Sequence, residues 1–141
     1  DMTMTRNSYN MIRRLESAGF DYSEATTLRR IQMTLHRWAE YECGIGEGQV
    51  SRSIERDDET GKPFMRVQYP TAGGYVDNRW PIADRERGAL TRLEKIMASH
   101  PDYVAYNQSD PRGCALYIVA KRDIGDMDVT ANYTRGIAVC D

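Results

Sequence analysis

Two short runs of β-branched and aromatic residues constrain this sequence most, and both lie within residues 103–119. Between them, residues 107–113 are all polar, proline or glycine, which is the pattern of two strands joined by a tight connection. Pro111 fixes φ at the first central position of a turn, and Gly113 can adopt a positive φ without a Cβ penalty. The segment therefore predicts a β-hairpin that presents Arg112 at its tip.

Two amphipathic helices are predicted before any strand. The first begins after Asn7 or Ser8, places Tyr9 on its apolar face and ends at Gly19. The second begins at a capping box formed by Asp21 and Glu24. Its apolar residues recur at steps of three and four, which predicts one buried stripe. They are Ala25, Leu28, Ile31, Leu35 and Trp38.

The rest of the chain predicts strands with one more helix. Residues 49–56 and 63–69 alternate with period two around a charged turn, which indicates a hairpin. A third helix follows Asp84 and stops before Pro101. The apolar run at residues 114–120 is typical of a strand in the middle of a sheet. Residues 136–140 predict a last strand at the chain terminus.

The predicted order is therefore α-α-β-β-α-β-β-β. Strands joined mostly by hairpins predict an α+β fold, in which three helices pack on an antiparallel sheet of about five strands. The 141 residues fit one domain, residues 1–141, because a second independent core would need a longer chain.

Composition places the chain among globular proteins of the cytoplasm. Hydrophobic residues make up 40% and charged residues 28%, and no apolar run approaches the ~20 residues that cross a bilayer. The net charge of −2 argues against a strongly basic surface that would attract nucleic acid everywhere. The three cysteines have no CxxC spacing, which favours reduced thiols.

Metal binding is not predicted. His36, Cys43, His100 and Cys114 could supply imidazole and thiolate ligands to zinc, but their spacing matches no known finger or catalytic signature. Isolated histidines and cysteines are more often ordinary surface and core residues. We expect no cofactor and name no catalytic residue.

Arginines on the second helix offer one candidate binding surface. Arg29 and Arg30 fall largely on the side of the helix opposite its apolar stripe, where they could contact phosphates. Glutamates share the same helix, so ion pairs at a solvated face explain these residues more simply.

The hairpin offers the other candidate surface. An arginine beside a turn presents a planar fork of donors to a carboxylate or phosphate, and nearby aromatic rings can stack on a base or a sugar. The alternative is a structural turn in which the acid accepts from backbone amides. The candidate residues are Tyr106, Gln108, Asp110, Arg112 and Tyr117.

Four segments resemble small proteins encoded by tailed phages and prophages. They are residues 34–44 (TLHRWAEYECG), 54–57 (IERD), 61–64 (GKPF) and 110–118 (DPRGCALYI). The resemblance implies a genomic setting and carries over no catalytic residue, because no biochemical activity is established for that group. It also implies a function by association, since small phage proteins commonly bind a host component and often inhibit CRISPR or other immune systems.

The leading hypothesis is a non-enzymatic phage protein that binds a host macromolecule in the host cytoplasm. The expected partner is a protein or ribonucleoprotein complex of a bacterial defence system, and no membrane is involved. One alternative is a nucleotide-binding protein or small enzyme with Arg112 as the anion clamp. Another is a nucleic-acid-binding accessory of phage replication. Homo-oligomer formation is left open.

Overall fold

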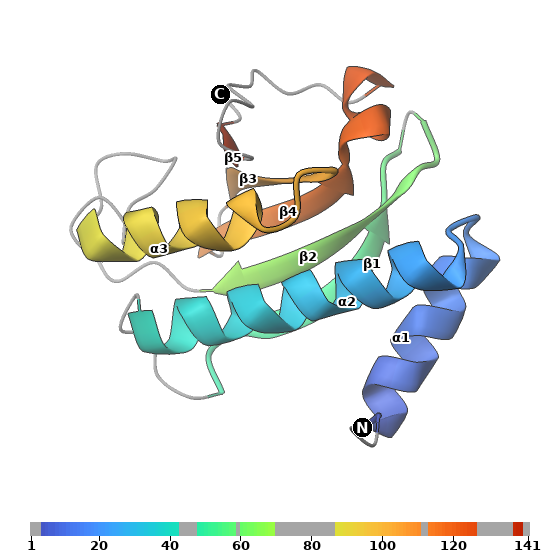
Figure 1. Cartoon of the computed structure of the whole chain (residues 1–141), viewed down its shortest axis with the longest axis horizontal. Helices are drawn as coiled ribbons and strands as arrows, with labels where there is room; N and C mark the ends of the chain where they lie inside the picture. The colour runs from blue at the N-terminus through green and yellow to red at the C-terminus, as the bar shows by residue number, and fades with distance from the viewer. Residues whose placement is uncertain are drawn as a thin grey trace.

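A five-stranded β-sheet with two helices across one face forms the centre of the computed structural model (Figure 1). The structure describes residues 4–42, 48–58, 60–69, 87–110, 113–126 and 137–139, and it omits the side chains of 41–42, 69, 87–90, 106–110, 113–115, 125–126 and 137–139. The helical elements are α1 (Arg6–Ser17), α2 (Tyr22–Arg37), a π-helix η1 (Trp38–Glu42), α3 (Arg87–Ala98) and a 3₁₀-helix η2 (Lys121–Asp126). The strands are β1 (Ser51–Arg56), β2 (Pro63–Tyr69), β3 (Tyr103–Asp110), β4 (Gly113–Ala120) and β5 (Ile137–Val139).

The predicted α+β class is confirmed, with three α-helices and four antiparallel strands. The strand order is β1-β2-β4-β3-β5, so β4 occupies the middle of the sheet. The prediction of an antiparallel sheet of about five strands is matched only in part, because β5 pairs with β3 in parallel. The chain leaves β4 at the end of the sheet where β3 begins. Since β3 already occupies the place beside β4, the returning strand joins the outer edge of β3 and runs in the same direction. The predicted element order also lacked the short helices η1 and η2.

The corner after α1 is a Schellman motif, as glycine at this position predicts. The N–H of Gly19 donates to the carbonyl of Glu16 at 3.0 Å, and the N–H of Phe20 donates to the carbonyl of Leu15 at 3.2 Å. Gly19 has a φ of 109°, which a residue with a Cβ adopts only under strain. Phe20 and Leu15 are both buried in the core, so the turn is also held by an apolar contact.

One face of the sheet supplies the core beneath α2 and α3. Successive strand residues point to opposite faces, so the register that places Met65 opposite Ile118 brings alternate residues of β2 and β4 to the same side. These residues join the apolar stripes of the helices in one cluster. Its members include Leu28, Ile31 and Leu35 of α2, Leu93 and Met97 of α3, and Met65, Val67, Leu116 and Ile118 of the sheet.

The hairpin of β3 and β4 is tighter than predicted. Strand pairing continues to Asp110 and Gly113, which face each other in the register, whereas the polar residues 107–110 were expected to belong to the connection. Pairing of the backbone does not require apolar side chains, which explains why the polar composition misplaced the end of the strand. Asp84, the predicted cap of α3, lies outside the described residues.

Two helical residues lie on the face opposite to the predicted one. Tyr9 is 51% exposed, because the buried stripe of α1 is narrow and consists of Ile12 and Leu15. Its hydroxyl accepts a hydrogen bond from Arg13. Arg29 is only 5% exposed and lies on the buried side of α2.

A polar relay runs through the interface between α2 and the sheet. The guanidinium of Arg29 donates to Ser8 Oγ at 3.0 Å and to Gln32 Oε1 at 2.7 Å. The fully buried amide of Gln32 donates in turn to the carbonyls of Ser53 on β1 and Arg66 on β2, at 3.1 and 3.0 Å. The relay therefore connects α1 and α2 to the neighbouring strands β1 and β2.

We expect the substitution Gln32→Leu to lower the free energy of unfolding by about 2 kcal/mol, because it keeps the approximate volume and removes three hydrogen bonds from a buried site. Urea denaturation measures the change. The matched control is Asn10→Leu at an exposed position of α1, which should change stability by no more than about 0.5 kcal/mol. Equal effects for the two variants would contradict a stabilising role for the relay.

Candidate functional site

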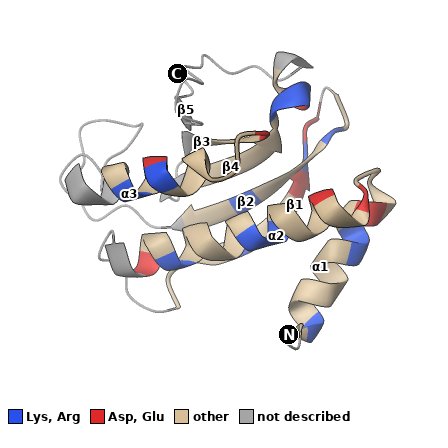
Figure 2. Ribbon diagram, viewed as in Figure 1, with Lys and Arg blue, Asp and Glu red and all other residues tan. Residues whose placement is uncertain are grey.

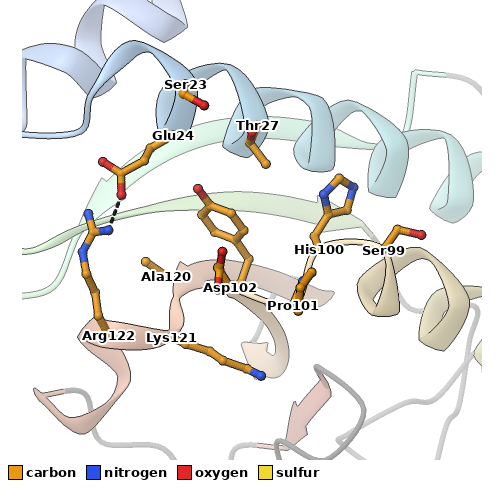
Figure 3. Close-up of a pocket in the computed structure, with 11 residues that line it drawn as sticks. Ser23, Glu24, Thr27, Ser99, His100, Pro101, Asp102, Ala120, Lys121 and Arg122 are labelled. Carbon is orange, nitrogen blue, oxygen red and sulfur yellow. Dashed lines mark hydrogen bonds and ion pairs between the residues drawn. The ribbon is translucent and has the colours of Figure 1, made fainter.

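A polar cleft lies where three segments of the chain meet (Figure 3). Its walls are the first half of α2, residues 99–103 at the turn from α3 into β3, and residues 120–122 at the junction of β4 and η2. The cavity has a volume of about 460 Å³. Hydroxyl, imidazole, phenol and charged groups of both signs line it, so it can hold a polar ligand or part of a partner.

The start of α2 is fixed at this cleft by the predicted capping box, which is confirmed. Asp21 Oδ1 accepts from the N–H of Glu24 at 2.8 Å, and Glu24 Oε1 accepts from the N–H of Asp21 at 3.1 Å. This reciprocal pair satisfies two backbone donors that the first turn would leave free. It also commits one carboxylate oxygen of Glu24 and holds the other toward η2.

Backbone hydrogen bonds hold the opposite wall. The N–H of Tyr103 donates to the carbonyl of His100 at 3.1 Å, which closes the turn that ends α3. The N–H of Lys121 donates to the carbonyl of Asp102 at 2.9 Å, next to the end of the β3–β4 pairing. Residues 100–103 are therefore held in place by hydrogen bonds that continue from the β3–β4 pairing.

An ion pair closes one end of the cleft. Arg122 Nη1 donates to Glu24 Oε2, and the Arg122 guanidinium lies 5.5 Å from the ring centre of Phe20 (Figure 3). The hydrogen bond from Arg122 lowers the pKa of Glu24, and the backbone N–H of Asp21 acts in the same direction. Glu24 is therefore a carboxylate at neutral pH.

Tyr103 is the most buried polar group of the cleft. Its side chain is 8% exposed, and its hydroxyl has no hydrogen-bond partner in the part of the chain that the structure describes. Burial raises the pKa of the phenol, the charge of Glu24 raises it further, and Arg122 opposes this effect. Asp102 and Asp21 also raise the pKa. The group stays a neutral phenol at physiological pH.

His100 lies at the other end of the cleft. Burial lowers the pKa of its imidazole, and the nearby charge of Arg30 lowers it further. His100 is thus neutral at pH 7, with one ring nitrogen that donates and one that accepts. Figure 3 shows its ring directed toward α2 and Thr27.

The candidate residues at the hairpin tip stay predictions. Arg112 lies outside the described residues. Tyr106, Gln108 and Asp110 belong to β3, but their side chains also lie outside the described part of the structure. The structure places Tyr117 on the face of the sheet opposite the core, where its ring stacks on Phe64 with the centres 4.7 Å apart.

The two arginines of the predicted basic strip have different surroundings. Arg30 is exposed and close enough to His100 to affect its pKa. Arg29 instead points inward to Ser8 and Gln32, and burial lowers the pKa of its guanidinium. The structure therefore does not bring Arg29, Arg30 and Tyr117 together on one surface.

The predicted candidate residues did not include the cleft residues Glu24, Tyr103 and Arg122. Glu24 was interpreted as a capping residue and as a partner for arginines of its own helix, and the basic pair Lys121–Arg122 after a buried strand carries no motif. A sequence separation of 98 residues divides Glu24 from Arg122. No local signal can indicate such a contact, so only the fold reveals the site.

The histidines show no metal site among the described residues. His36 Nε2 lies 3.1 Å from Glu40 Oε1, and its Nδ1 lies 3.4 Å from Arg52 Nη1. A neutral imidazole with its proton on Nε2 satisfies both contacts, which agrees with a pKa lowered by burial and by Arg52. No group of three or more potential ligands converges in the described ranges.

The comparisons with known proteins identify no relative. The sequence matches no protein-family model and no curated protein, and the fold matches no solved structure. None of the helices in the described part of the chain has both the length and the apolar character that crossing a bilayer requires.

We expect Arg122→Met to lower the free energy of unfolding by about 0.5 kcal/mol at pH 7, a small value because the Arg122 side chain is 57% exposed. The pKa of Glu24 is lowered in the folded state, so the contribution is present above the usual value of 4.5 and is lost as pH falls through the folded pKa. Urea denaturation at pH 7 and at successively lower pH values below 4.5 measures both effects. Arg14→Met, at an exposed position of α1, is the control. A difference between Arg122→Met and the wild type that is as large at the lowest pH as at pH 7 would contradict the assignment.

Proposed function

We propose that the chain is a non-enzymatic protein of a tailed phage or prophage that binds a host macromolecule in the host cytoplasm. The proposed partner is a protein or ribonucleoprotein complex of a bacterial defence system. The resemblance of four sequence segments to small phage proteins supports the phage setting. The cleft beside α2 supports binding.

The single observation that carries the proposal is the set of uncommitted polar groups in this cleft. His100, Asp102, Tyr103 and Lys121 line it, and in the described part of the chain their side chains have no hydrogen-bond or ion-pair partner. They come from two connected segments that backbone hydrogen bonds hold in place. Because the backbone that carries these groups is already ordered, binding a partner does not include the entropic cost of ordering it.

Charges of both signs around the cleft favour a partner with a complementary pattern. Figure 2 shows acidic positions at the start of α2 and basic positions at the start of η2. Complementary charges on two partners contribute more to the specificity and rate of their association than to its affinity. The tip of the β3–β4 hairpin, with Gln108, Asp110 and Arg112, is the second proposed contact surface.

Capture of a partner from a lysate of the bacterial host tests the proposal. We expect the tagged wild-type protein to retain a specific host protein or complex at micromolar concentration, and Asp102→Arg to retain at least about fivefold less, since a reversed charge at an interface is repulsive. Mass spectrometry identifies and quantifies the retained proteins. Arg112→Ala tests the hairpin tip, and Arg14→Ala is the control. Recovery of no specific partner by the wild-type protein would contradict the proposal.

A second candidate is a binding protein for a nucleotide-like anion. The observation that favours it is the charge of Arg30, which acts on His100 at one end of the cleft. Lys121 supplies a second cation to the lining. A nucleotide at a hundred times its dissociation constant should stabilise the fold by ~2.7 kcal/mol. A thermal shift assay against a nucleotide panel measures this effect. Stabilisation that Arg30→Ala abolishes would favour this candidate, and no shift with any nucleotide would contradict it.

A further inference from the structure

The hydroxyl of Tyr103 is the strongest indication of what the cleft binds. The side chain is 8% exposed and lines the cavity, but the hydroxyl has no partner among the described residues. The hydroxyl borders the cavity and is not used by the described part of the chain, so it is available to bond to an incoming group. The group is a neutral phenol, which can accept as well as donate.

The charges around this hydroxyl select the kind of group that approaches it. Glu24, Asp102 and Asp21 all act on Tyr103 as negative charges, and Arg122 acts as the opposing positive charge. Arg122 is already bound to Glu24. Asp102 is exposed, and its carboxylate has no partner in the described part of the chain. This end of the cleft therefore favours a positively charged donor.

The remaining cation of the lining is directed elsewhere. Figure 3 shows the Lys121 side chain running below Pro101 and away from α2, whereas the carboxylate of Asp102 points toward the α2 side of the cleft. The cavity of about 460 Å³ has room for more than one side chain. The hydroxyls of Ser23 and Thr27 on the α2 wall can bond to a peptide backbone.

We propose that the cleft accepts a lysine or arginine side chain of a protein partner, which donates hydrogen bonds to the hydroxyl oxygen of Tyr103 and to the carboxylate of Asp102. The inference rests on the proposed function, because the cation belongs to the macromolecule that the protein binds. It commits that partner to a protein with an exposed basic segment. The phosphates of a nucleic acid would meet the carboxylates of Asp102 and Glu24, which repel them.

A short basic peptide tests the site directly. The probe is the acetylated and amidated peptide Ala-Lys-Ala-Lys-Ala, and the comparison is the same peptide with both lysine amines acetylated. We expect the lysine peptide to shift the backbone amide NMR signals of residues 99, 100, 102, 103 and 120–122 in a saturable way, and the acetylated peptide to leave them unchanged. Equal shifts with both peptides, or no shift with either, would overturn the proposal.

Two near-isosteric variants assign the binding to the named groups. Tyr103→Phe removes only the hydroxyl and should weaken binding of the lysine peptide about tenfold, and Asp102→Asn should weaken it about threefold because that carboxylate is exposed. The controls are Tyr9→Phe and Asp58→Asn, which make the same chemical changes at exposed positions outside the cleft. Wild-type affinity in both cleft variants would overturn the assignment.

The melting temperature of Tyr103→Phe is a second readout. An unpartnered buried hydroxyl contributes nothing favourable to folding, so we expect the variant to melt at the same temperature as the wild type or higher. A lower melting temperature would show that the hydroxyl already has a partner within the chain, and it would overturn the proposal.

The lysate experiment separates this inference from the proposed function. If the wild type, Tyr103→Phe and Asp102→Asn all retain the same host partner equally, binding of a macromolecule stands and the basic side chain in the cleft is excluded. If the lysine peptide binds as expected but no host partner is recovered, the cation site stands and the proposed function is contradicted.

Discussion

Burial of one face of the sheet beneath α2 is the constraint on which the rest of the structure depends. Side chains alternate along a strand, so placing Met65 and Ile118 under the helix commits Phe64 and Tyr117 to the opposite face. A shift of one residue in the register would turn Met65 and Val67 away from the helices and turn Arg66 and Gln68 toward them. The single long stripe of α2 therefore determines both faces of the sheet.

The interface between α2 and the sheet is not wholly apolar, and its polar part contributes to position. Gln32 spans β1 and β2 by donating to the carbonyls of Ser53 and Arg66, and it accepts from Arg29. Apolar contacts tolerate small displacements of a helix, whereas hydrogen bonds of this geometry do not. The relay therefore favours one placement of α2 along the strands. Arg29 is buried, and burying a charged group without partners is costly. Its hydrogen bonds to the neutral side chains of Ser8 and Gln32 offset part of that cost.

The cleft is a consequence of where α2 begins. The Schellman turn at Gly19 and the capping box at Asp21 start the helix beside the junction of β4 and η2, where Arg122 can reach Glu24. The turn from α3 into β3 forms the facing wall, because the sheet places Tyr103 opposite Ala120. Polar groups that the two walls do not use for their own structure remain directed at the space between them.

The sequence by itself determined the features that depend on neighbouring residues. Gly19 ends α1, the spacing of Asp21 and Glu24 starts α2, and turn residues between alternating runs produce both hairpins, because each of these preferences acts over a few positions. Only the tertiary structure decided the parallel pairing of β5, the inward direction of Arg29 and the meeting of Glu24 with Arg122. Helical periodicity separates apolar from polar residues, but it does not indicate which polar residue a neighbouring element will cover. These outcomes depend on which distant segments occupy the same space, and residues 98 positions apart leave no local pattern that records it.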